Sequence, residues 1–598
     1  MPAFVVAAVV GVLFFLGYRY YSTYLAKRVY ALDPAFLTPA HEFNDGNDFV
    51  PTNKHVLFGH HFTSVAGAAP IVGPAIAVFW GWGPALVWIV LGTIFAAGVH
   101  DFGALVVSVR HKAKSIGTLA GSVINARARM LFLAIIFFLL TLVNAVFAVV
   151  IGNLFVANPG AVIPILVEIP LAMAIGQYIY RTRSSALIPS IVGVIALYAL
   201  ILVGNQFPIS LDGLAEALGV EQTRNVWVVL LFAYTWVASR IPVWMLLQPR
   251  DYINSHQLFI ALGVIALGVI IGMNTIVAPV VNDVPEGSPS FFPFLFITIA
   301  CGAISGFHSL VSSGTTSKQL DKDTDARYVG YMGAVGEGSL ATGAVLAVTA
   351  GVAASRADWD ALYPDFATAS GGAVGNFVNG VAVFANNIGI PLDLATIFAA
   401  VVVISFAATT MDTGVRLQRY VVQEIGEVTH ITPLARNLTL ATTIAVLIPL
   451  GMALIPGGGP AGYTFGVLWQ LFGTTNQLTA ALALSVIAVW VTRSGRNPTA
   501  ILVPLVFLLG MTTWALLVNL RNFVRDDQWV LAPLDALIFV LAMWLVVEAG
   551  LALRTALRER TAPGEMLHAS SAAPASAVSR ANEPTDRPLG ESSQDDVR

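Results

Sequence analysis

The chain has 598 residues, of which 57% are hydrophobic and only 11% charged, and its net charge is −3. Soluble domains carry about 25% charged residues, so this composition excludes a soluble protein, and no nucleic-acid partner is expected. The single cysteine, Cys301, excludes an internal disulfide framework. Many separate apolar runs predict an all-α polytopic membrane protein, because transmembrane barrels show short alternating strands instead.

Apolar runs long enough to cross a bilayer as helices, which takes about 20 residues, recur along the whole chain. The first run lacks the charged leader of a cleaved signal peptide and predicts a membrane helix. We expect about fifteen crossings in all. They are residues 3–24, 57–79, 84–109, 131–157, 161–180, 186–204, 226–247, 256–282, 291–314, 328–354, 393–411, 434–455, 462–491, 499–520 and 531–553.

Lysine and arginine are concentrated in alternate loops, such as those that follow residues 24, 109 and 180. Short loops rich in these residues stay in the cytoplasm, so this side of the membrane is predicted to be cytoplasmic. The N-terminus is then outside and the C-terminus inside. Arg521 and Arg525 are an exception, because the same alternation puts them outside, beside two aspartates.

Other segments are not expected to cross the membrane. Residues 25–55 form a polar cytoplasmic loop, and residues 112–128 are basic and amphipathic, which is typical of a surface helix. Residues 371–390 are rich in Gly and Asn, and we interpret them as a re-entrant or lid-like segment. Residues 561–598 have no apolar period and predict a disordered cytoplasmic tail.

Residues 56–79 interrupt their apolar run with polar side chains and then with glycines and prolines. Proline removes a backbone donor and glycine weakens a helix interior, so a helix that only anchors would avoid them. The pattern predicts a discontinuous helix that lines a polar site, as in secondary transporters, or else a kinked helix packed on small residues. The residues concerned are His60, His61, Thr63, Ser64, Gly67, Pro70, Gly73 and Pro74.

A second stretch repeats this pattern in the opposite orientation. Residues 59–67 and 306–314 both read G-x-H-x5-G, so that His61 corresponds to His308. The first stretch runs outward and the second inward, as expected for an inverted repeat. Each is followed by one crossing, one non-crossing segment and another long crossing. The expected fold is therefore a LeuT-like arrangement of two inverted repeats of five helices, with extra helices.

This repeat divides the chain into parts of different expected roles. They are a peripheral first helix with its loop (1–55), the first repeat (56–204), inserted helices (205–290), the second repeat (291–491), C-terminal helices (492–560) and the tail (561–598).

Ionisable side chains inside crossings are candidates for function, because burying them in lipid is costly. His61 and His308 lie in the two broken helices, and histidine titrates near neutral pH. The alternative is that both histidines only hold helices together by hydrogen bonds. His100 and Asp101 are interpreted as an interfacial pair. The candidate proton carriers are His61, Glu337 and Glu168, of which we prefer His61.

Hydroxyl groups at residues 405–413 suggest a cation site. Thr409 and Thr410, together with carbonyls of a broken helix, would suit Na⁺, and Asp412 lies beside them. Alternatively, the hydroxyls bond to carbonyls of their own helix, and Asp412 pairs with Arg416 one turn on.

Acidic and histidine side chains near residues 41–61 also form an inventory that could ligate a metal. However, the chain has no HExxH motif, no CxxC motif and no phosphate-binding loop. A membrane metalloenzyme is therefore a minor alternative, and no cofactor is expected.

Six long motifs run through the chain. They are GYRYYS at 17–22, PAHEFNDGNDFVPTNKHVLFGHHFTSVAGAAPIVGPAIA at 39–77, VHDFGALVVSVRHKAKSIG at 99–117, GFHSLVSSGTTSKQL at 306–320, TTMDTGVRLQRYVVQE at 409–424 and LFGTTNQLTAALAL at 471–484. They closely resemble the carbon starvation protein A (CstA) family, over nearly all of residues 1–555. The resemblance implies a bacterial inner-membrane secondary transporter of the amino acid–polyamine–organocation superfamily, which takes up peptides or pyruvate, with proton coupling favoured, under nutrient limitation.

The resulting hypothesis is a proton symporter that imports a small carboxylate, either pyruvate or a short peptide, by alternating access. The alternatives are a sodium-coupled importer of the same substrates, a nutrient sensor and the metalloenzyme. The residues expected to bind the substrate are His61, Gly67, Ala69, Pro70, Gly73, His308, Ser312, Ser313 and Gly314. The residues expected to couple it to a proton or Na⁺ are His61, Glu337, Glu168, Thr409, Thr410 and Asp412.

Overall fold

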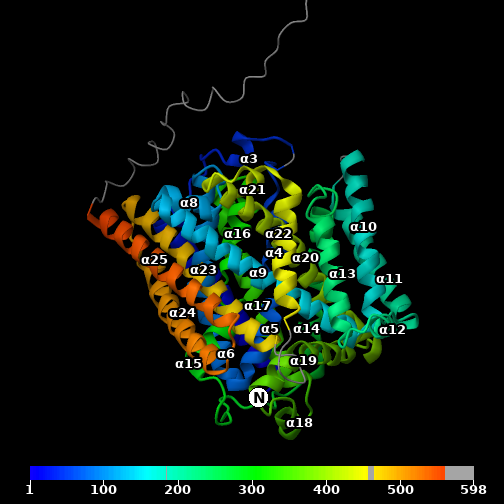
Figure 1. Ribbon diagram of the computed structural model, residues 1–598. Helices are drawn as coiled ribbons and strands as arrows, with labels where there is room; N and C mark the ends of the chain where they lie inside the picture. Colours follow the sequence, from blue (N-terminus) through cyan, green and yellow to red (C-terminus); the bar gives the residue numbers. More distant parts are fainter. Residues whose placement is uncertain (47, 183–184, 456–463, 559–598) are drawn as a thin grey trace, which may run out of the picture.

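The computed structural model describes residues 1–598 except 47, 183–184, 456–463 and 559–598. In these described ranges all regular secondary structure is helical, and the helices form one bundle (Figure 1). The prediction of an all-α membrane protein is confirmed. The predicted tail, residues 561–598, lies outside the described residues.

The helices have the following bounds. The first part of the chain contains α1 (Ala3–Leu16), α2 (Ser22–Tyr24), α3 (Pro39–Glu42), α4 (Lys54–Val65), α5 (Ala69–Ala77), α6 (Trp82–Gly92), α7 (Gly98–Arg110), α8 (Ile116–Val123) and α9 (Ala126–Ala157). It is followed by α10 (Val162–Thr182), α11 (Leu187–Gln206), α12 (Asp212–Ala217), α13 (Thr223–Ala238), α14 (Leu247–Gly272), α15 (Phe291–Thr298) and α16 (Gly306–Gly314). The last part contains α17 (Met332–Leu346), α18 (Arg356–Leu362), α19 (Phe366–Asn387), α20 (Leu392–Val428), α21 (Thr432–Arg436), α22 (Leu438–Ala453), α23 (Thr464–Arg493), α24 (Thr499–Arg525) and α25 (Leu531–Arg558).

Short π-helical turns extend several of these helices into longer rods. They lie at Gly17–Tyr21, Leu25–Val29, Thr93–Ala97, Arg327–Tyr331 and Ala347–Gly351. One such rod runs through α6 and α7, and another carries α17. Both rods lie in the interior of the bundle, because most residues in their most apolar stretch are buried.

Among the described residues, eleven helices are long and apolar enough to cross a membrane, and the bent pair formed by Lys54–Val65 and Ala69–Trp80 makes a twelfth. The sequence predicts about fifteen. The remaining three predicted crossings correspond to shorter pieces, namely α13, the broken pair α15 and α16, and α22. A helix of 16 residues rises only about 24 Å, less than a hydrocarbon core, so their status as full crossings stays a prediction.

The bundle has two distinct ends. In Figure 1 the helices α3, α8 and α21 lie at the upper end, which we call the α3 end. The N-terminus and α18 lie at the lower end, which we call the α18 end. The orientation proposed from the loop charges makes the α3 end cytoplasmic.

Three expected boundaries are corrected by the structure. The first helical span continues to Val29, so the predicted loop at 25–55 begins later and contains the short helix α3. The predicted surface helix at 112–128 is only α8, and Leu119 and Ala120 are buried in the bundle, where α8 packs on α9. Residues 371–387 of the predicted segment 371–390 belong to α19, a continuous helix whose Asp365 cap accepts a hydrogen bond from the backbone of Thr368.

Candidate functional site

The two broken helices cross each other at their breaks. The first break separates α4 from α5, and the second separates α15 from α16. A Cβ atom on Gly73 would collide with the carbonyl oxygen of Thr298, and Gly302, at φ +96°, lies against Pro70. Glycine at these two positions therefore lets the backbones approach closely and lets the chain adopt a left-handed conformation.

This crossing predicts a sharp effect of a single methyl group. Gly73→Ala should force α5 and α15 apart and lower thermal stability in detergent by about 1–3 kcal/mol. The matched control is Gly263→Ala in α14, where nothing lies within 4 Å of the added Cβ. Equal unfolding temperatures for the two variants would contradict the close approach.

The carbonyl groups freed at the second break are satisfied by side chains from other helices. Trp469 and Trp88 donate their indole N–H groups to Thr298 and Ile299, at 3.3 and 3.2 Å. The hydroxyl of Thr93 donates to Gly302 at 3.2 Å. A backbone that leaves the helical pattern at membrane depth needs such partners, so these contacts stabilise the break.

The second half-helix, α16, is fixed at its start by Asn476 of α23. The amide oxygen of Asn476 accepts the backbone N–H of Phe307 at 3.0 Å, and its NH₂ group donates to Ser305 at 3.1 Å. Gln477 beside it donates to the carbonyl of Phe296 at 3.1 Å. These amides therefore hold helices together around the break.

A buried chain of ionisable side chains lies beside the crossing, and we call it the His308 cluster. It consists of His100, Asp101, His308 and Glu337. His308 Nδ1 lies 2.8 Å from Asp101 Oδ2, and His308 Nε2 lies 3.2 Å from Glu337 Oε1. His100 Nδ1 lies 2.7 Å from the other oxygen of Asp101. All four side chains are at most 1% exposed, so His100 and Asp101 form their predicted pair inside the bundle, and their interfacial position in the membrane stays a prediction.

His61 lies on α4, the first half of the other broken helix, and has a different partner. Its Nδ1 is 2.9 Å from the hydroxyl of Thr316, and its Nε2 has no hydrogen-bond partner among the described residues. The ring packs against Gly333, one turn before Glu337 on α17. His61 thus lies next to the His308 cluster, but it forms no contact with an acidic side chain in the part of the chain that the structure describes.

Thr410 of α20 lies at the first break. A Cβ on Gly67 would be 2.5 Å from the Thr410 hydroxyl oxygen. The Thr410 hydroxyl donates to the carbonyl of Phe406 at 2.9 Å, and Thr409 accepts a hydrogen bond from Asn254 at 2.5 Å. The hydroxyls therefore have structural partners, but each oxygen keeps lone pairs that a cation would accept.

Glu168 and Asp412 belong to a second buried group, which we call the Arg250 network. Arg250 lies 3.2 Å from Glu168 and 2.7 Å from Asp412, and Tyr234 donates to Asp412 at 2.8 Å. Ser405 donates to Glu168 at 3.0 Å. The network connects α10, α13, α14 and α20.

The predicted pairing of Asp412 with Arg416 is therefore wrong. Arg416 donates instead to the backbone carbonyls of Ala238 and Ile241, at 3.1 and 2.6 Å. The predicted interfacial position also fails, since α20 continues to Val428 and leaves Asp412 buried in the middle of a 37-residue helix.

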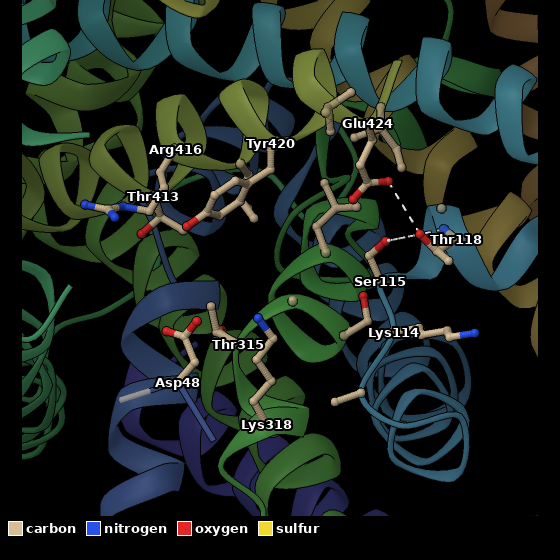
Figure 2. A pocket seen from close by; sticks show the side chains of 18 of the residues that line it. Asp48, Lys114, Ser115, Thr118, Thr315, Lys318, Thr413, Arg416, Tyr420 and Glu424 are labelled. Carbon is tan, nitrogen blue, oxygen red and sulfur yellow. Dashed lines mark hydrogen bonds between the residues drawn. The ribbon is translucent and has the colours of Figure 1, made fainter. Parts of the chain in front are cut away.

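A cavity of about 510 Å³ lies between α4, α8, α9, α14, α16 and α20. Figure 2 shows Lys318 extending its ammonium group into the open space, with Asp48 and Thr315 beside it. Glu424 lies on the far side, within 3.5 Å of the Thr118 hydroxyl, while Lys114 points away from the space (Figure 2). The lining comes largely from the α3 end and reaches inward to Ser64, one residue before the end of α4.

The cavity meets only part of the set predicted to bind substrate. Ser313 and Gly314 line it. The remaining members are buried outside its lining, around the crossing and the His308 cluster. They are His61, Gly67, Ala69, Pro70, Gly73, His308 and Ser312.

The histidines near residues 41–61 turn to four different partners. His41 contacts Asp321 at 2.9 Å, and His55 contacts Tyr328 at 3.2 Å. His60 contacts Asp251 at 2.9 Å. His61 contacts Thr316, so each of the four histidines has a different partner, and the four partners lie in different parts of the chain.

Comparison with known proteins identifies the family. A family model described as carbon starvation protein CstA matches residues 2–361 and 360–515. The chain belongs to the carbon starvation protein CstA family. The resemblance that the six motifs carry is thereby confirmed.

Named relatives of the CstA family are transporters. The peptide transporter CstA of Escherichia coli (strain K12) is 34% identical over 84% of this chain and 79% of that protein. The peptide transporter CstA of Campylobacter jejuni is 33% identical over 85% of this chain and 79% of that protein. The pyruvate/proton symporter BtsT of Escherichia coli is 31% identical over 86% of this chain and 81% of that protein. This chain is accordingly a multi-pass membrane transporter and not an enzyme.

Three charged residues at this candidate site are not recognisable as site residues from the sequence pattern. Arg250 and Asp251 lie just before the predicted crossing 256–282, where they read as loop residues, but α14 begins at Leu247 and buries both. Lys318 follows the repeat motif and reads only as an orientation signal. The signal that could identify Arg250 and Asp251 is that two opposite charges stand next to the apolar run of α14. Burying charged side chains in a membrane helix costs free energy, so such residues are candidates for function.

Proposed function

We propose that the chain is a bacterial inner-membrane symporter that imports a small carboxylate, pyruvate or a short peptide, together with a proton. The relatives named for peptides and for pyruvate support this range of substrates. Alternating access would come from rocking of the two predicted repeats around the crossing, with α19 as the outer lid. The N-terminus would be outside and the C-terminus in the cytoplasm.

The observation that carries this proposal is the His308 cluster beside the crossing of the two broken helices. Two imidazoles and two carboxylates at most 1% exposed are costly in a membrane protein, and such groups mark proton paths. The Glu337 carboxylate lies 3.2 Å from His308. Protonation of Glu337 removes a negative charge from this contact, and protonation of His308 adds a positive charge to it. The sequence favours His61 as the proton carrier, but we propose the Glu337–His308 pair instead, because His308 Nε2 lies 3.2 Å from the Glu337 carboxylate.

A coupled cycle follows from these contacts. With Glu337 protonated, the cluster loses one negative charge, and an anionic substrate can approach the half-helices α5 and α16 whose N-terminal ends favour negative charge. After the repeats rock, the substrate leaves through the cavity at the α3 end, and the proton follows. Ser313 and Gly314, which line that cavity at the end of α16, would contact the substrate on this path.

The sodium-coupled alternative rests on one contact, that of Thr410 with Gly67 at the first break. Backbone carbonyls at the break and the hydroxyls of Thr409 and Thr410 are oxygen ligands of the kind that Na⁺ takes. We propose the proton as the coupling ion because the ionisable groups gather at the other break.

Uptake into proteoliposomes tests the proposal. Labelled pyruvate and labelled alanylalanine are supplied outside, with an inward proton gradient in sodium-free buffer or with an inward sodium gradient at equal pH. We expect accumulation of at least one substrate with the proton gradient, and its loss on addition of a protonophore. Accumulation with sodium alone would establish the alternative, and binding without any exchange of label would indicate a sensor.

A further inference from the structure

The inner wall of the cavity carries a carboxylate that is only half satisfied. Asp251 of α14 is 1% exposed and lines the cavity together with His60 of α4. Asp251 Oδ2 lies 2.9 Å from His60 Nδ1. Asp251 Oδ1 and His60 Nε2 have no hydrogen-bond partner within the described part of the chain. A buried carboxylate oxygen without a donor costs free energy unless a ligand or water supplies one.

The position of Asp251 is fixed by close packing of α4 on α14. A Cβ on Gly59 would lie 2.6 Å from the hydroxyl of Ser255, which is one turn after Asp251. On the same faces, Phe62 packs on Phe259 with ring centroids 5.8 Å apart. The carboxylate is therefore held on a rigid surface formed by α4 and α14, as a binding group should be.

Within the described residues, no lysine or arginine forms an ion pair with this carboxylate. Arg250, the adjacent residue, is committed to Glu168 and Asp412. Lys318, whose ammonium group projects into the same cavity (Figure 2), forms no ion pair in the described residues and lies 5.5 Å from the ring centroid of Phe49. The cavity thus presents an anion at its inner wall and a separate cation.

The other acidic groups of the cavity are less suited to hold a ligand in place. Asp48 and Glu427 are exposed to solvent. Glu424 lies within reach of the Thr118 hydroxyl at 3.5 Å (Figure 2). A charged contact gains most where water is excluded, which favours the buried carboxylate of Asp251.

We propose that Asp251 binds the ammonium group of a zwitterionic substrate, such as the N-terminus of a short peptide, and that His60 is a positioning residue that fixes the carboxylate. This inference rests on the proposed function and selects the peptide class over an anion such as pyruvate, which has no ammonium group. The two carboxylate oxygens then have one donor each, from His60 and from the substrate. Lys318 gives the cavity the complementary charge for the other end of the zwitterion.

Binding measurements on the purified full chain test this assignment with two probes that differ only in the ammonium group. Alanylalanine and N-acetyl-alanylalanine are titrated against the wild-type protein and against Asp251→Asn, an isosteric change. We expect the wild type to prefer alanylalanine by about tenfold or more, because the acetylated probe leaves the buried Asp251 carboxylate without its partner. Asp251→Asn should lose that preference, because the variant has no carboxylate to pair with the ammonium group. The matched control is Asp48→Asn, which changes an exposed carboxylate of the same cavity and should keep the preference.

Equal affinity of the wild type for the two probes, or no binding of alanylalanine, would overturn the assignment even if Asp251→Asn failed to fold. An unchanged preference in folded Asp251→Asn would overturn it too. The proposed function fails in a different way, when the proteoliposomes accumulate neither substrate. Uptake of pyruvate alone would support symport and refute the ammonium site. Asp251-dependent binding of alanylalanine without uptake of either substrate would support the ammonium site and refute symport.

Discussion

Glu337→Gln should abolish proton-driven accumulation while leaving exchange of substrate across the membrane intact. Glutamine has the shape of a protonated glutamate and keeps the side chain next to His308, whose Nε2 lies 3.2 Å from the carboxylate. It cannot take up or release a proton, so the carrier would behave as if permanently protonated. A carrier in that state can still exchange bound substrate, but a pH difference no longer drives it.

The size of the effect follows from the driving force. For one proton per anion and no membrane potential, one unit of pH difference sustains about tenfold accumulation at equilibrium, since that is 1.4 kcal/mol. Wild-type proteoliposomes should approach this ratio, and Glu337→Gln should remain near equal concentrations inside and outside.

Two measurements on the same vesicles separate the interpretations. Counterflow, with unlabelled substrate inside, reports exchange, and net uptake reports coupling. The matched control is Glu286→Gln, which changes an exposed loop glutamate and should behave as wild type. Normal accumulation by Glu337→Gln would remove Glu337 from the coupling path, and loss of counterflow as well would mean that the side chain is needed for binding or folding.

The breaks in the helices could be predicted from the sequence because their causes are local. Proline and glycine interrupt an apolar run at Gly67 and Pro70, and the structure ends α4 at Val65 and starts α5 at Ala69. The G-x-H-x5-G motif likewise pointed to His308, which lies on the second half-helix. Family membership was equally accessible, since whole motifs carry it.

The partners of the charged residues could not be predicted, because they come from distant parts of the chain. Asp101 and His308 are 207 positions apart, and Arg250 and Asp412 are 162 apart. A hydropathy window shows that such residues are buried but not which of them meet. It also ended the crossing at 393–411 too early, because Arg416 and Arg419 read as interfacial although both donate to backbone carbonyls inside the bundle.

The Arg250 network gives the largest expected effect on stability. Arg250→Met removes a guanidinium that is 1% exposed and leaves the carboxylates of Glu168 and Asp412 buried without their cation. Breaking such a pair costs about 3–5 kcal/mol, so we expect a large fall in the unfolding temperature in detergent and little folded protein. Arg525→Met is the matched control, since the Arg525–Asp526 pair is solvent-exposed and such pairs contribute about 0–1 kcal/mol.

A combined variant then separates the cost of unpaired charge from the loss of packing. Adding Glu168→Gln and Asp412→Asn to Arg250→Met removes both uncompensated carboxylates while keeping the side-chain volumes, so most of the lost stability should return. Recovery would show that Arg250 stabilises the contact between α10, α14 and α20 chiefly by compensating the two buried carboxylates. If the triple variant stayed as unstable as Arg250→Met alone, the arginine would act through its packing and hydrogen bonds to Tyr234. If the triple variant regains stability and still accumulates substrate, Glu168 and Asp412 are not needed for proton coupling. That result would agree with our proposal that the Glu337–His308 pair carries the proton.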